Sequence, residues 1–420
     1  MTQGKLDIEI LRNGGGVITV SDEIGAGVLG RPLALPCGLV LKNRIIKSAM
    51  SDSLGDGQGN ATPAQARLYE RWAEGGVALS LIGEVQADPR YPEKPGNLVL
   101  GPDTDMAALR NLAHKGQVNS AHLWPQLGHA GALSYAPVSA PKGPSPLDMD
   151  GLHCAGFSVE DIEALSAQYA RAAKIAVEAG FTGVQIHAGH GFLLSQFLSP
   201  LFNHRTDCYG GEIGNRFRII GMIIDAVREA VGARVAIGIK MNATDQLEGG
   251  LTQEDGLVVV RLLDQTSVDL IEISGGTYFP GAPSSSDSTS GTGPYFLEFC
   301  KAAKKATKIP LCVTGGFKTR TQAVAALTSG DVDAVGIARG LVVMPDLAAH
   351  WVAGNGPDPS FPRFSQTVPG GVTAWYSMRL TAISEDREDH FDLDLSEALQ
   401  VYDARDQARC HLWNARLQSS

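Results

Sequence analysis

A repeating order of short apolar segments and longer helical segments constrains the fold of this chain more than any other feature. We expect the short apolar segments to form eight strands, at residues 44–49, 77–85, 121–127, 182–187, 234–241, 268–274, 309–314 and 331–337. Some of them, such as VALSLI, VAIGI and DLIEI, are apolar almost throughout. This is typical of strands in a parallel sheet that is covered on both faces.

Helical segments follow these strands and carry recognisable start signals. We expect helices at 62–73, 104–118, 158–178, 215–231, 252–265, 294–307, 319–328 and 341–352. Ser158 with Asp161, and Thr319 with Gln322, have the spacing of a capping box at a helix start. Eight strand–helix pairs favour an α/β fold of the closed (β/α)8 TIM barrel type over an open doubly wound sheet. No predicted strand is followed by GxGxxG, which also weakens the open sheet.

The length of the chain, 420 residues, suits one large barrel with extensions at both ends. We expect an N-terminal arm at 1–40, the barrel at 41–355 and a C-terminal helical extension packed on the barrel at 356–420. Two long loops after predicted strands, 129–157 and 275–293, are expected on the catalytic face of such a barrel.

The charge and the cysteines exclude several classes of function. A formal net charge of -10 argues against a broad surface for nucleic acid or anionic membrane, because both need clustered Lys and Arg. The six cysteines show neither CxxC nor a metal-ligand spacing, so we expect no metal site and reduced thiols. With neither a signal peptide nor a membrane-length apolar run, a cytoplasmic protein is expected. Its partner is then a small-molecule substrate, and a homo-oligomer stays open.

Polar residues gather at the ends of the predicted strands, which face the active site in a barrel. They are Ser48, Ser51, Glu84, Gln126, His129, His187, His190, Lys240, Asn242, Gly315, Gly316 and Arg339. Barrel phosphate sites are commonly built from the loops after strands seven and eight. Gly315, Gly316 and Arg339 are therefore a candidate phosphate site, and an ordinary strand-to-helix turn is the alternative.

Lys240 lies in an apolar strand, VAIGIKM, where an unpaired ammonium would be costly to bury. We therefore expect an anion beside it, and the reduced flavin ring is such an anion. A lysine whose head reaches solvent at the strand end is one alternative. A Schiff-base lysine of an aldolase or lyase is another.

His187 and His190 follow the predicted fourth strand, three residues apart. They could be a metal pair, a core pair or two donors aimed at a carbonyl oxygen. A third metal ligand at a fixed spacing is not evident nearby. Two histidines in a strand-ending loop favour the polarisation of a substrate oxygen. In the loop that follows, Arg205, Asp207 and Tyr209 are expected to organise the loop rather than to react.

The motifs of this chain, taken together and in order, resemble those of the old yellow enzyme family of FMN-dependent NADH:flavin oxidoreductases and ene-reductases. They cover roughly residues 35–345 and are LKNRIIKSAM, PGNLVL, QLGHAG, IHAGHGFLLSQFLSP, NHRTDCYGG, NRFR, IKMNATDQLEGGLTQEDG, VTGGF and VGIARGL. The resemblance implies a TIM barrel with non-covalent FMN, reduced by NADH or NADPH. Hydride then passes to the activated C=C bond of an α,β-unsaturated carbonyl compound.

The resemblance also implies roles for single residues. Ser48, Ala49 and Ser51 would line the flavin ring, with Ser51 where relatives place a Thr or Cys that tunes the flavin. The remaining FMN ligands would be Glu84, Gln126, His187, Lys240, Gly315, Gly316, Ala338 and Arg339. Substrate would be bound by His187, His190, Phe192 and Tyr278. Catalysis is assigned to His187, His190 and Ser51. Because the chain lacks a cysteine cluster and further length, a stand-alone barrel is expected.

One departure from the family pattern concerns the proton donor. Many relatives have HGY where this chain has HGF, and Phe192 cannot donate a proton. Ser53, Tyr135, Tyr278 and water are the candidates in its place. A flavin-dependent dehydrogenase or a redox-neutral isomerase of a biosynthetic intermediate would not need that donor. Either is an alternative function, as is a non-catalytic flavin-binding barrel. A second departure is Glu84, where close relatives often carry a neutral residue, so the flavin edge is expected to be more acidic.

Overall fold

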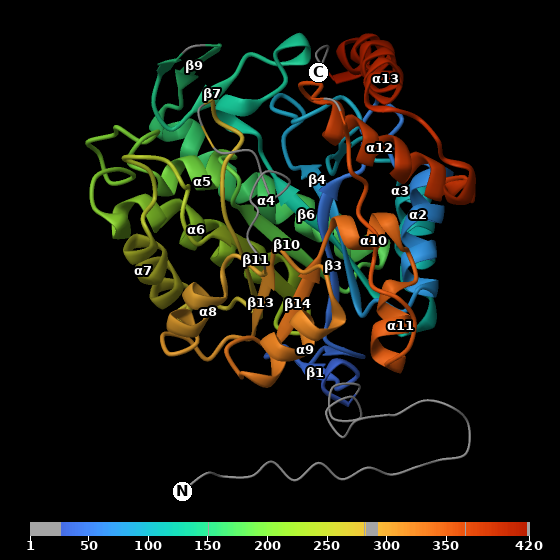
Figure 1. Ribbon diagram of the computed structural model, residues 1–420. Coiled ribbons are helices and arrows are strands. Elements are labelled where there is room, and N and C mark those ends of the chain that lie inside the picture. The colour runs from blue at the N-terminus through green and yellow to red at the C-terminus, as the bar shows by residue number, and fades with distance from the viewer. Residues whose placement is uncertain (1–26, 150, 281, 283–292, 366, 418–420) are drawn as a thin grey trace, which may run out of the picture.

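Eight parallel strands close into a barrel in the computed structural model, which describes residues 27–149, 151–280, 282, 293–365 and 367–417 (Figure 1). Most of the expected N-terminal arm lies outside these residues. The barrel strands are β3 (Ile45–Ser51), β4 (Leu79–Gln86), β6 (His122–Gly128), β10 (Gly183–Ala188), β11 (Ala236–Asn242), β12 (Leu270–Ser274), β13 (Leu311–Thr314) and β14 (Ala334–Ile337). β3 pairs with both β14 and β4, which closes the ring. The predicted (β/α)8 barrel is confirmed.

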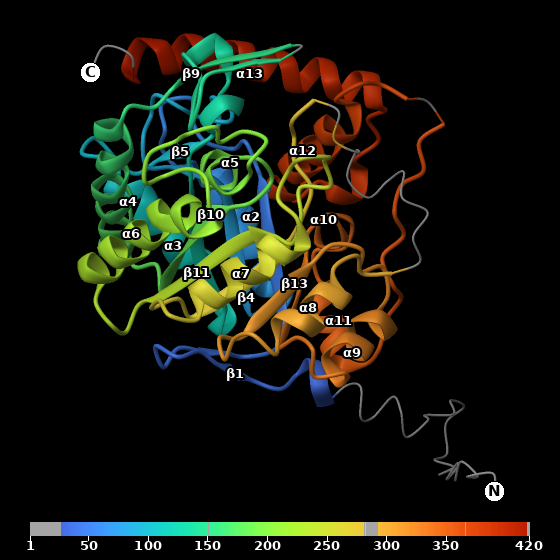
Figure 2. The same cartoon turned by 90° about the vertical axis from the view of Figure 1, so that its left-hand side faces the viewer.

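The amino ends of the barrel strands are covered by an antiparallel hairpin, β1 (Leu33–Ala34) and β2 (Val40–Leu41). Its leucines pack in one buried cluster with Trp124 and the first residues of several strands. Figure 2 shows the hairpin below the barrel. Because apolar side chains close this end, polar chemistry is confined to the carboxyl ends of the strands.

Helices surround the barrel, and most lie where the sequence places them. They are α2 (Pro63–Glu74), α3 (Met106–Lys115), α4 (Val159–Ala179), α6 (Ile213–Val231), α7 (Gln253–Leu263), α8 (Leu297–Ala303) and α9 (Arg320–Thr328). The capping boxes at Ser158 and Thr319 are both formed. None of the helices in the described part of the chain is long and apolar enough to cross a membrane.

Two local expectations differ from the structure. The helix expected at 341–352 is split into α10 (Arg339–Val343) and α11 (Leu347–Ala353). Pro345 forces Met344 into an extended conformation, and this ends α10. The loop after His190 contains a short helix, α5 (Leu193–Leu198), whose side chains are all buried. With only six residues, this helix is too short to show a helical period in the sequence.

The loop at 129–157 contains more structure than expected. It forms the 3-10 turns Gly131–Leu133 and Ala136–Val138 and three short strands, β7 (Lys142–Gly143), β8 (Leu147–Met149) and β9 (Leu152–Gly156). β8 and β9 form an antiparallel hairpin. A further short strand, β5 (Leu98–Val99), pairs with β4. These additions lie at the carboxyl ends of the barrel strands and extend that end of the barrel.

The last long helix, α13 (Leu395–Leu417), spans the same face, as Figure 2 shows. Its side chains hold loops that follow the first two barrel strands. Arg409 donates to the carbonyl of Ser53, and Trp413 Nε1 donates to the carbonyl of Pro89. The C-terminal segment therefore packs against the part of the barrel that carries the candidate site.

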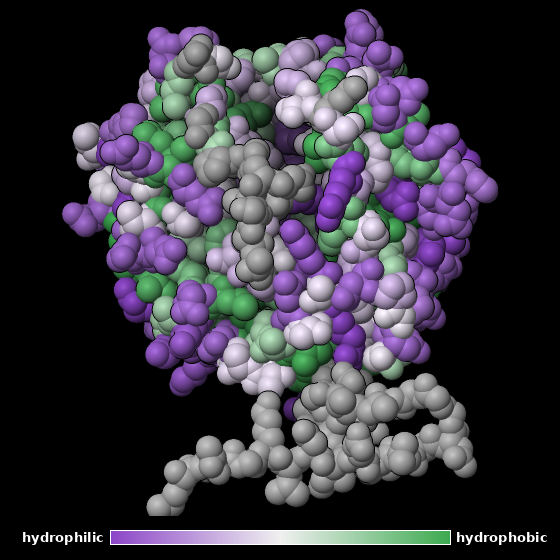
Figure 3. All heavy atoms as spheres, in the orientation of Figure 1, coloured by the Kyte–Doolittle hydropathy of each residue, from purple (hydrophilic) through white to green (hydrophobic). Residues whose placement is uncertain are grey.

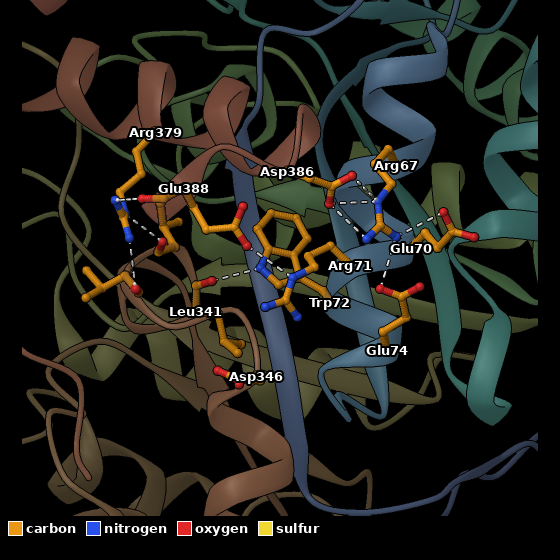
Figure 4. Close-up of polar contacts among 12 residues, drawn as sticks. Arg67, Glu70, Arg71, Trp72, Glu74, Leu341, Asp346, Arg379, Asp386 and Glu388 are labelled. Atoms are coloured by element: carbon orange, nitrogen blue, oxygen red, sulfur yellow. Dashed lines mark hydrogen bonds and ion pairs between the residues drawn. The ribbon is translucent and has the colours of Figure 1, made fainter. Parts of the chain in front are cut away.

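A second C-terminal helix, α12 (Gly371–Ser384), packs beside α2. Arg67 of α2 pairs with Asp386, and Arg71 pairs with Glu388 (Figure 4). Beneath these pairs, the buried Trp72 donates through Nε1 to the carbonyl of Leu341 at 2.8 Å. Since surface ion pairs contribute little, the buried ring is expected to contribute more to stability than these ion pairs.

Replacement of Trp72 by alanine should therefore destabilise the protein far more than loss of the ion pairs above it. Trp72→Ala removes a buried ring and its hydrogen bond, at a cost of about 3–5 kcal/mol in the free energy of unfolding. Arg67→Ala should cost about 1 kcal/mol or less. Urea unfolding followed by circular dichroism measures both, and equal losses would contradict this ranking.

Candidate active site

A chain of hydrogen bonds crosses the barrel near the carboxyl ends of five strands. Gln126 Nε2 donates to Gln185 Oε1 at 2.6 Å, and Gln185 Nε2 donates to Glu272 Oε2 at 2.7 Å. Thr314 Oγ1 donates to Glu272 Oε1 at 2.7 Å. Ser48 Oγ lies 2.7 Å from Thr314 Oγ1, so the chain runs from β6 to β3. We call these residues and Lys240 the polar floor of the site.

Lys240 finds its anion within the protein. Its Nζ lies 3.2 Å from Glu272 Oε1 on the adjacent strand, where the two residues are register partners. Burial alone would raise the pKa of Glu272, but Lys240, Thr314 and Gln185 hold it at about 2. The carboxylate is therefore ionised at neutral pH. The expectation of an anion beside Lys240 is met by Glu272, in addition to any ligand.

Three members of the polar floor were not singled out from the sequence: Gln185, Glu272 and Thr314. Glu272 lies in the apolar segment DLIEI, so the argument that marked Lys240 would also have marked this carboxylate. Gln185 and Thr314 carried no comparable signal, because neutral polar side chains are common at strand ends.

The two predicted histidines meet directly above the strand ends. His187 Nε2 lies 3.2 Å from His190 Nδ1, and His190 Nε2 lies 3.0 Å from Ser274 Oγ. On its other side, His187 Nδ1 is 2.7 Å from Glu84 Oε1. His190 has a positive φ of 58°, and its backbone N–H donates to Asn242 Oδ1 at 2.9 Å. The backbone is thus bent so that both rings reach one place.

We call His187, His190, Glu84 and the neighbouring Phe192 and Tyr278 the wall of the site. The two histidines and Glu84 are neutral near neutral pH. Burial, together with the charge of Lys240, lowers the pKa of His187 to about 3. The same two causes lower the pKa of His190. Burial raises the pKa of Glu84 to about 8, although Lys240 acts in the opposite direction. The contact between Glu84 and His187 is therefore one between a carboxylic acid and a neutral imidazole, not an ion pair.

Phe192 and Tyr278 complete the wall beside the histidines. The Phe192 ring is buried, and its centroid lies 5.1 Å from that of His187. The Tyr278 ring lies 5.8 Å from Phe192 and 5.9 Å from His190. Of the proton-donor candidates, Tyr278 is thus brought to the histidines. Ser53 and Tyr135 lie instead in the segments that contact α13.

At the opposite end of the site, Gly315 and Gly316 follow β13 with φ angles of 118° and 85°. Such angles favour glycine, and a Cβ at Gly316 would lie 2.4 Å from the carbonyl oxygen of Gly293. The next strand, β14, is followed by α10. Ala338 is the N-cap of this helix, and Arg339 is its first residue. The guanidinium of Arg339 lies 5.6 Å from the centroid of the Tyr376 ring. The predicted phosphate residues therefore come together from two neighbouring strands.

Ser51 ends β3 and is bonded to a residue that the sequence did not mark. Its Oγ donates to Glu93 Oε2 at 2.9 Å. Burial and the nearby Glu84 raise the pKa of Glu93 to about 7. A Glu in a proline- and glycine-rich loop carries no chemical signal in the sequence, so only the structure shows it beside Ser51.

The loop residues Arg205 and Asp207 pair with each other, as expected for loop organisers. Arg205 also donates to the carbonyls of Pro144 and Phe157, at 2.9 and 2.7 Å. It thereby ties the loop after α5 to the segment that carries β7–β9. These residues support the site without facing it.

The residues present fit a flavin nucleotide. Among the described residues, Glu84 Oε2 is buried without a hydrogen-bond partner. It faces the strand end of β6, where a Cβ on Gly128 would lie 2.7 Å away. Lys240 has three N–H groups, and one contact to Glu272 leaves donors for a ligand. Figure 3 shows the surface hollowed between the segments that carry β7–β9 and α12–α13.

Comparison with known proteins gives the same family. The sequence matches the NADH:flavin oxidoreductase / NADH oxidase family over residues 29–354. It is 32% identical over 414 residues to the NADH-dependent flavin oxidoreductase iliE of a Neonectria species, which covers 88% of this chain and 52% of that one. It is 33% identical over 346 residues to the protein of the same name from Hypocrea jecorina, which covers 75% and 86%.

This chain thus spans about half the length of the Neonectria relative. A solved structure of the old yellow enzyme homologue from Zymomonas mobilis is similar in fold, with a TM-score of 0.68 at 22% identity. The similarity covers 81% of this chain and 98% of that one. The chain therefore belongs to the NADH:flavin oxidoreductase / NADH oxidase family, whose members bind FMN and use NAD(P)H.

Proposed function

We propose that this protein reduces the activated C=C bond of an α,β-unsaturated carbonyl compound, with NAD(P)H as the reductant. The observation that carries the proposal is the pair of neutral histidines, His187 and His190, at a strand end above the buried Lys240–Glu272 ion pair. Neutral imidazole N–H groups suit a carbonyl oxygen, because they donate hydrogen bonds and keep their protons. The proposed reduction therefore depends on both the histidines of the wall and the polar floor beneath them.

FMN, when bound, supplies the ring that carries hydride between the two substrates. The polar floor residues Gln126 and Lys240, with Ser48, Ala49 and Ser51 from β3, would hold the ring. Gly315, Gly316, Ala338 and Arg339 would hold the phosphate, through backbone N–H groups and one guanidinium. Glu84 would face the ring from β4. The ring residues of β3 and the phosphate residues of β14 come from neighbouring strands, so one elongated ligand can contact both groups.

The histidines would orient the substrate and polarise it. To bond both rings, a carbonyl oxygen would replace the contact between His187 Nε2 and His190 Nδ1. The bonded oxygen would carry more negative charge, which makes the β-carbon a better hydride acceptor. Phe192 and Tyr278 would pack against the apolar part of the substrate, since both rings touch the histidine pair.

The absence of a hydroxyl on Phe192 favours a second candidate function. The buried ring lies against His187, and it cannot give the proton that saturation of the α-carbon requires. A dehydrogenase or a redox-neutral isomerase with the same floor and wall would not need that proton. The Schiff-base alternative is disfavoured, because Lys240 is 2% exposed and in contact with Glu272.

The test of the main proposal is a visible spectrum of the purified protein under anaerobic conditions. We expect a bound flavin spectrum that bleaches with NADPH or NADH and returns on addition of 2-cyclohexenone. The saturated ketone should form in the same amount as the nucleotide oxidised. Bleaching with no return on any enone, but with isomerised or oxidised product from another substrate, would support the second candidate. A flavin that NAD(P)H cannot reduce would show a non-catalytic binding barrel.

Restoring a hydroxyl at residue 192 should accelerate enone reduction. Phe192→Tyr adds a proton donor beside His187, and kcat for 2-cyclohexenone should rise on the order of 10-fold or more. Phe192→Leu is the matched control, since it alters the ring without adding a donor, and it should give no acceleration. An unchanged kcat in Phe192→Tyr would mean that proton delivery does not limit the rate.

Arg339 should matter for binding of FMN. Loss of a charge-assisted hydrogen bond to phosphate in Arg339→Ala should raise the Kd of FMN by about 10- to 100-fold. Arg387→Ala removes an arginine that is 61% exposed and pairs with Glu385, so the Kd should stay unchanged. Titration of the apoprotein with FMN, followed by quenching of flavin fluorescence, measures both. Equal affinities in the two variants would place the phosphate elsewhere.

A further inference from the structure

The hydroxyl of Ser51 has only one proton, and in this structure that proton is committed to Glu93. Ser51 Oγ donates to Glu93 Oε2 at 2.9 Å, while Asn97 Nδ2 lies 3.4 Å from both of those oxygens. An ionised carboxylate accepts hydrogen bonds and donates none. While Glu93 is ionised, the Ser51 hydroxyl therefore presents only lone pairs to a ligand at the end of β3.

Protonation of Glu93 reverses the direction of this hydrogen bond. A carboxylic acid has an O–H group that can donate to Ser51 Oγ. The Ser51 proton is then released and can turn to an acceptor on the ligand side. The two forms of Glu93 thus give the same serine opposite hydrogen-bonding behaviour.

We propose that Glu93 is a positioning residue that sets the reduction potential of the bound flavin through the hydroxyl of Ser51. The inference rests on the proposed placement of Ser51 against the flavin ring. A donor at the ring edge stabilises the negative charge gained on reduction and raises the potential. When Glu93 is ionised and accepts the Ser51 proton, the serine presents no donor to the ring, and the potential is lowered.

The loop that carries Glu93 is held firmly enough for this role. Asn97 Oδ1 accepts from the backbone N–H groups of Glu93 and Lys94, each at 3.0 Å, and from Gln86 Nε2 at 3.2 Å. At the start of the same loop, the carbonyl of Pro89 accepts from Trp413 of α13. The carboxyl is therefore fixed with respect to Ser51 from both sides of the loop.

The charged groups around Glu93 place its titration near neutral pH. Burial raises the pKa of Glu93 to about 7; Glu84 of β4 acts in the same direction, and Lys94 acts in the opposite one. The Lys94 ammonium is directed to the Tyr135 ring and to Asp406 of α13, at 4.4 and 3.6 Å.

Two phenols also lie within electrostatic reach of Glu93. They are Tyr278, beyond β12, and Tyr402 of α13. Both are neutral near neutral pH, because the ordinary pKa of a phenol is about 10, and burial raises the pKa of Tyr402 further. The potential should therefore fall more steeply across pH 7 than it would without this carboxyl, as Glu93 loses its proton.

The test is the midpoint potential of FMN-loaded protein at about pH 6 and about pH 8, on either side of the Glu93 pKa. In Glu93→Gln, the carboxyl cannot ionise, so the potential at the higher pH should rise and the excess fall between the two values should disappear. Ser51→Ala should lower the potential at the lower pH and remove the same excess fall. Asp88→Asn is the matched control, because Asp88 is in the same loop but pairs with Arg90. Its potentials should follow those of the unaltered protein.

Potentials of Glu93→Gln that equal those of the unaltered protein at both pH values would overturn the proposal. So would an unchanged potential in Ser51→Ala, which supplies the decision if Glu93→Gln does not fold. The measurement of the potential needs no enone. A failure of enone reduction would therefore overturn the proposed function but would not decide whether Glu93 sets the potential.

Discussion

The contact between Lys240 and Glu272 is the interaction on which the rest of the site depends. Two buried charges on neighbouring strands are register partners 3.2 Å apart. Removal of either partner would leave an uncompensated charge in the interior, which is strongly destabilising. Thr314 donates to the same oxygen of Glu272 as Lys240, and Gln185 donates to the other oxygen. The ion pair thereby orients Gln185 of β10 and Thr314 of β13, on either side of Glu272 in the sheet.

Burial, together with the charge of Lys240, also determines the protonation state of the histidines above this floor. Lys240 acts with burial to keep His187 and His190 neutral, so that they are hydrogen-bonding groups and not cations. Burial keeps Glu84 protonated beside His187, against the effect of the same ammonium. The site therefore contains several protons within a short distance of one another, although Phe192 offers none.

The catalytic face is completed by segments distant in the chain. α13 contacts the loops after β3 and β4, through Arg409 and Trp413. Those loops carry Ser53 and Glu93, and Glu93 in turn bonds to Ser51. A helix that ends nearly 370 residues after Ser51 thus supports the surroundings of that hydroxyl. Such a contact adds rigidity where the barrel itself has only loops.

The sequence by itself determined the barrel, because strand and helix periods, caps and strand-ending polar residues are local properties of the chain. It also predicted that Ser48, Gln126, Lys240 and the two histidines lie at one edge of the barrel, since parallel strands bring their carboxyl ends together. Only the tertiary structure decided which groups touch. Glu272 opposite Lys240 depends on strand register, and Glu93 beside Ser51 depends on the path of a loop. The protonation of Glu84 depends on burial, and burial is produced by segments that are distant from each other in the sequence.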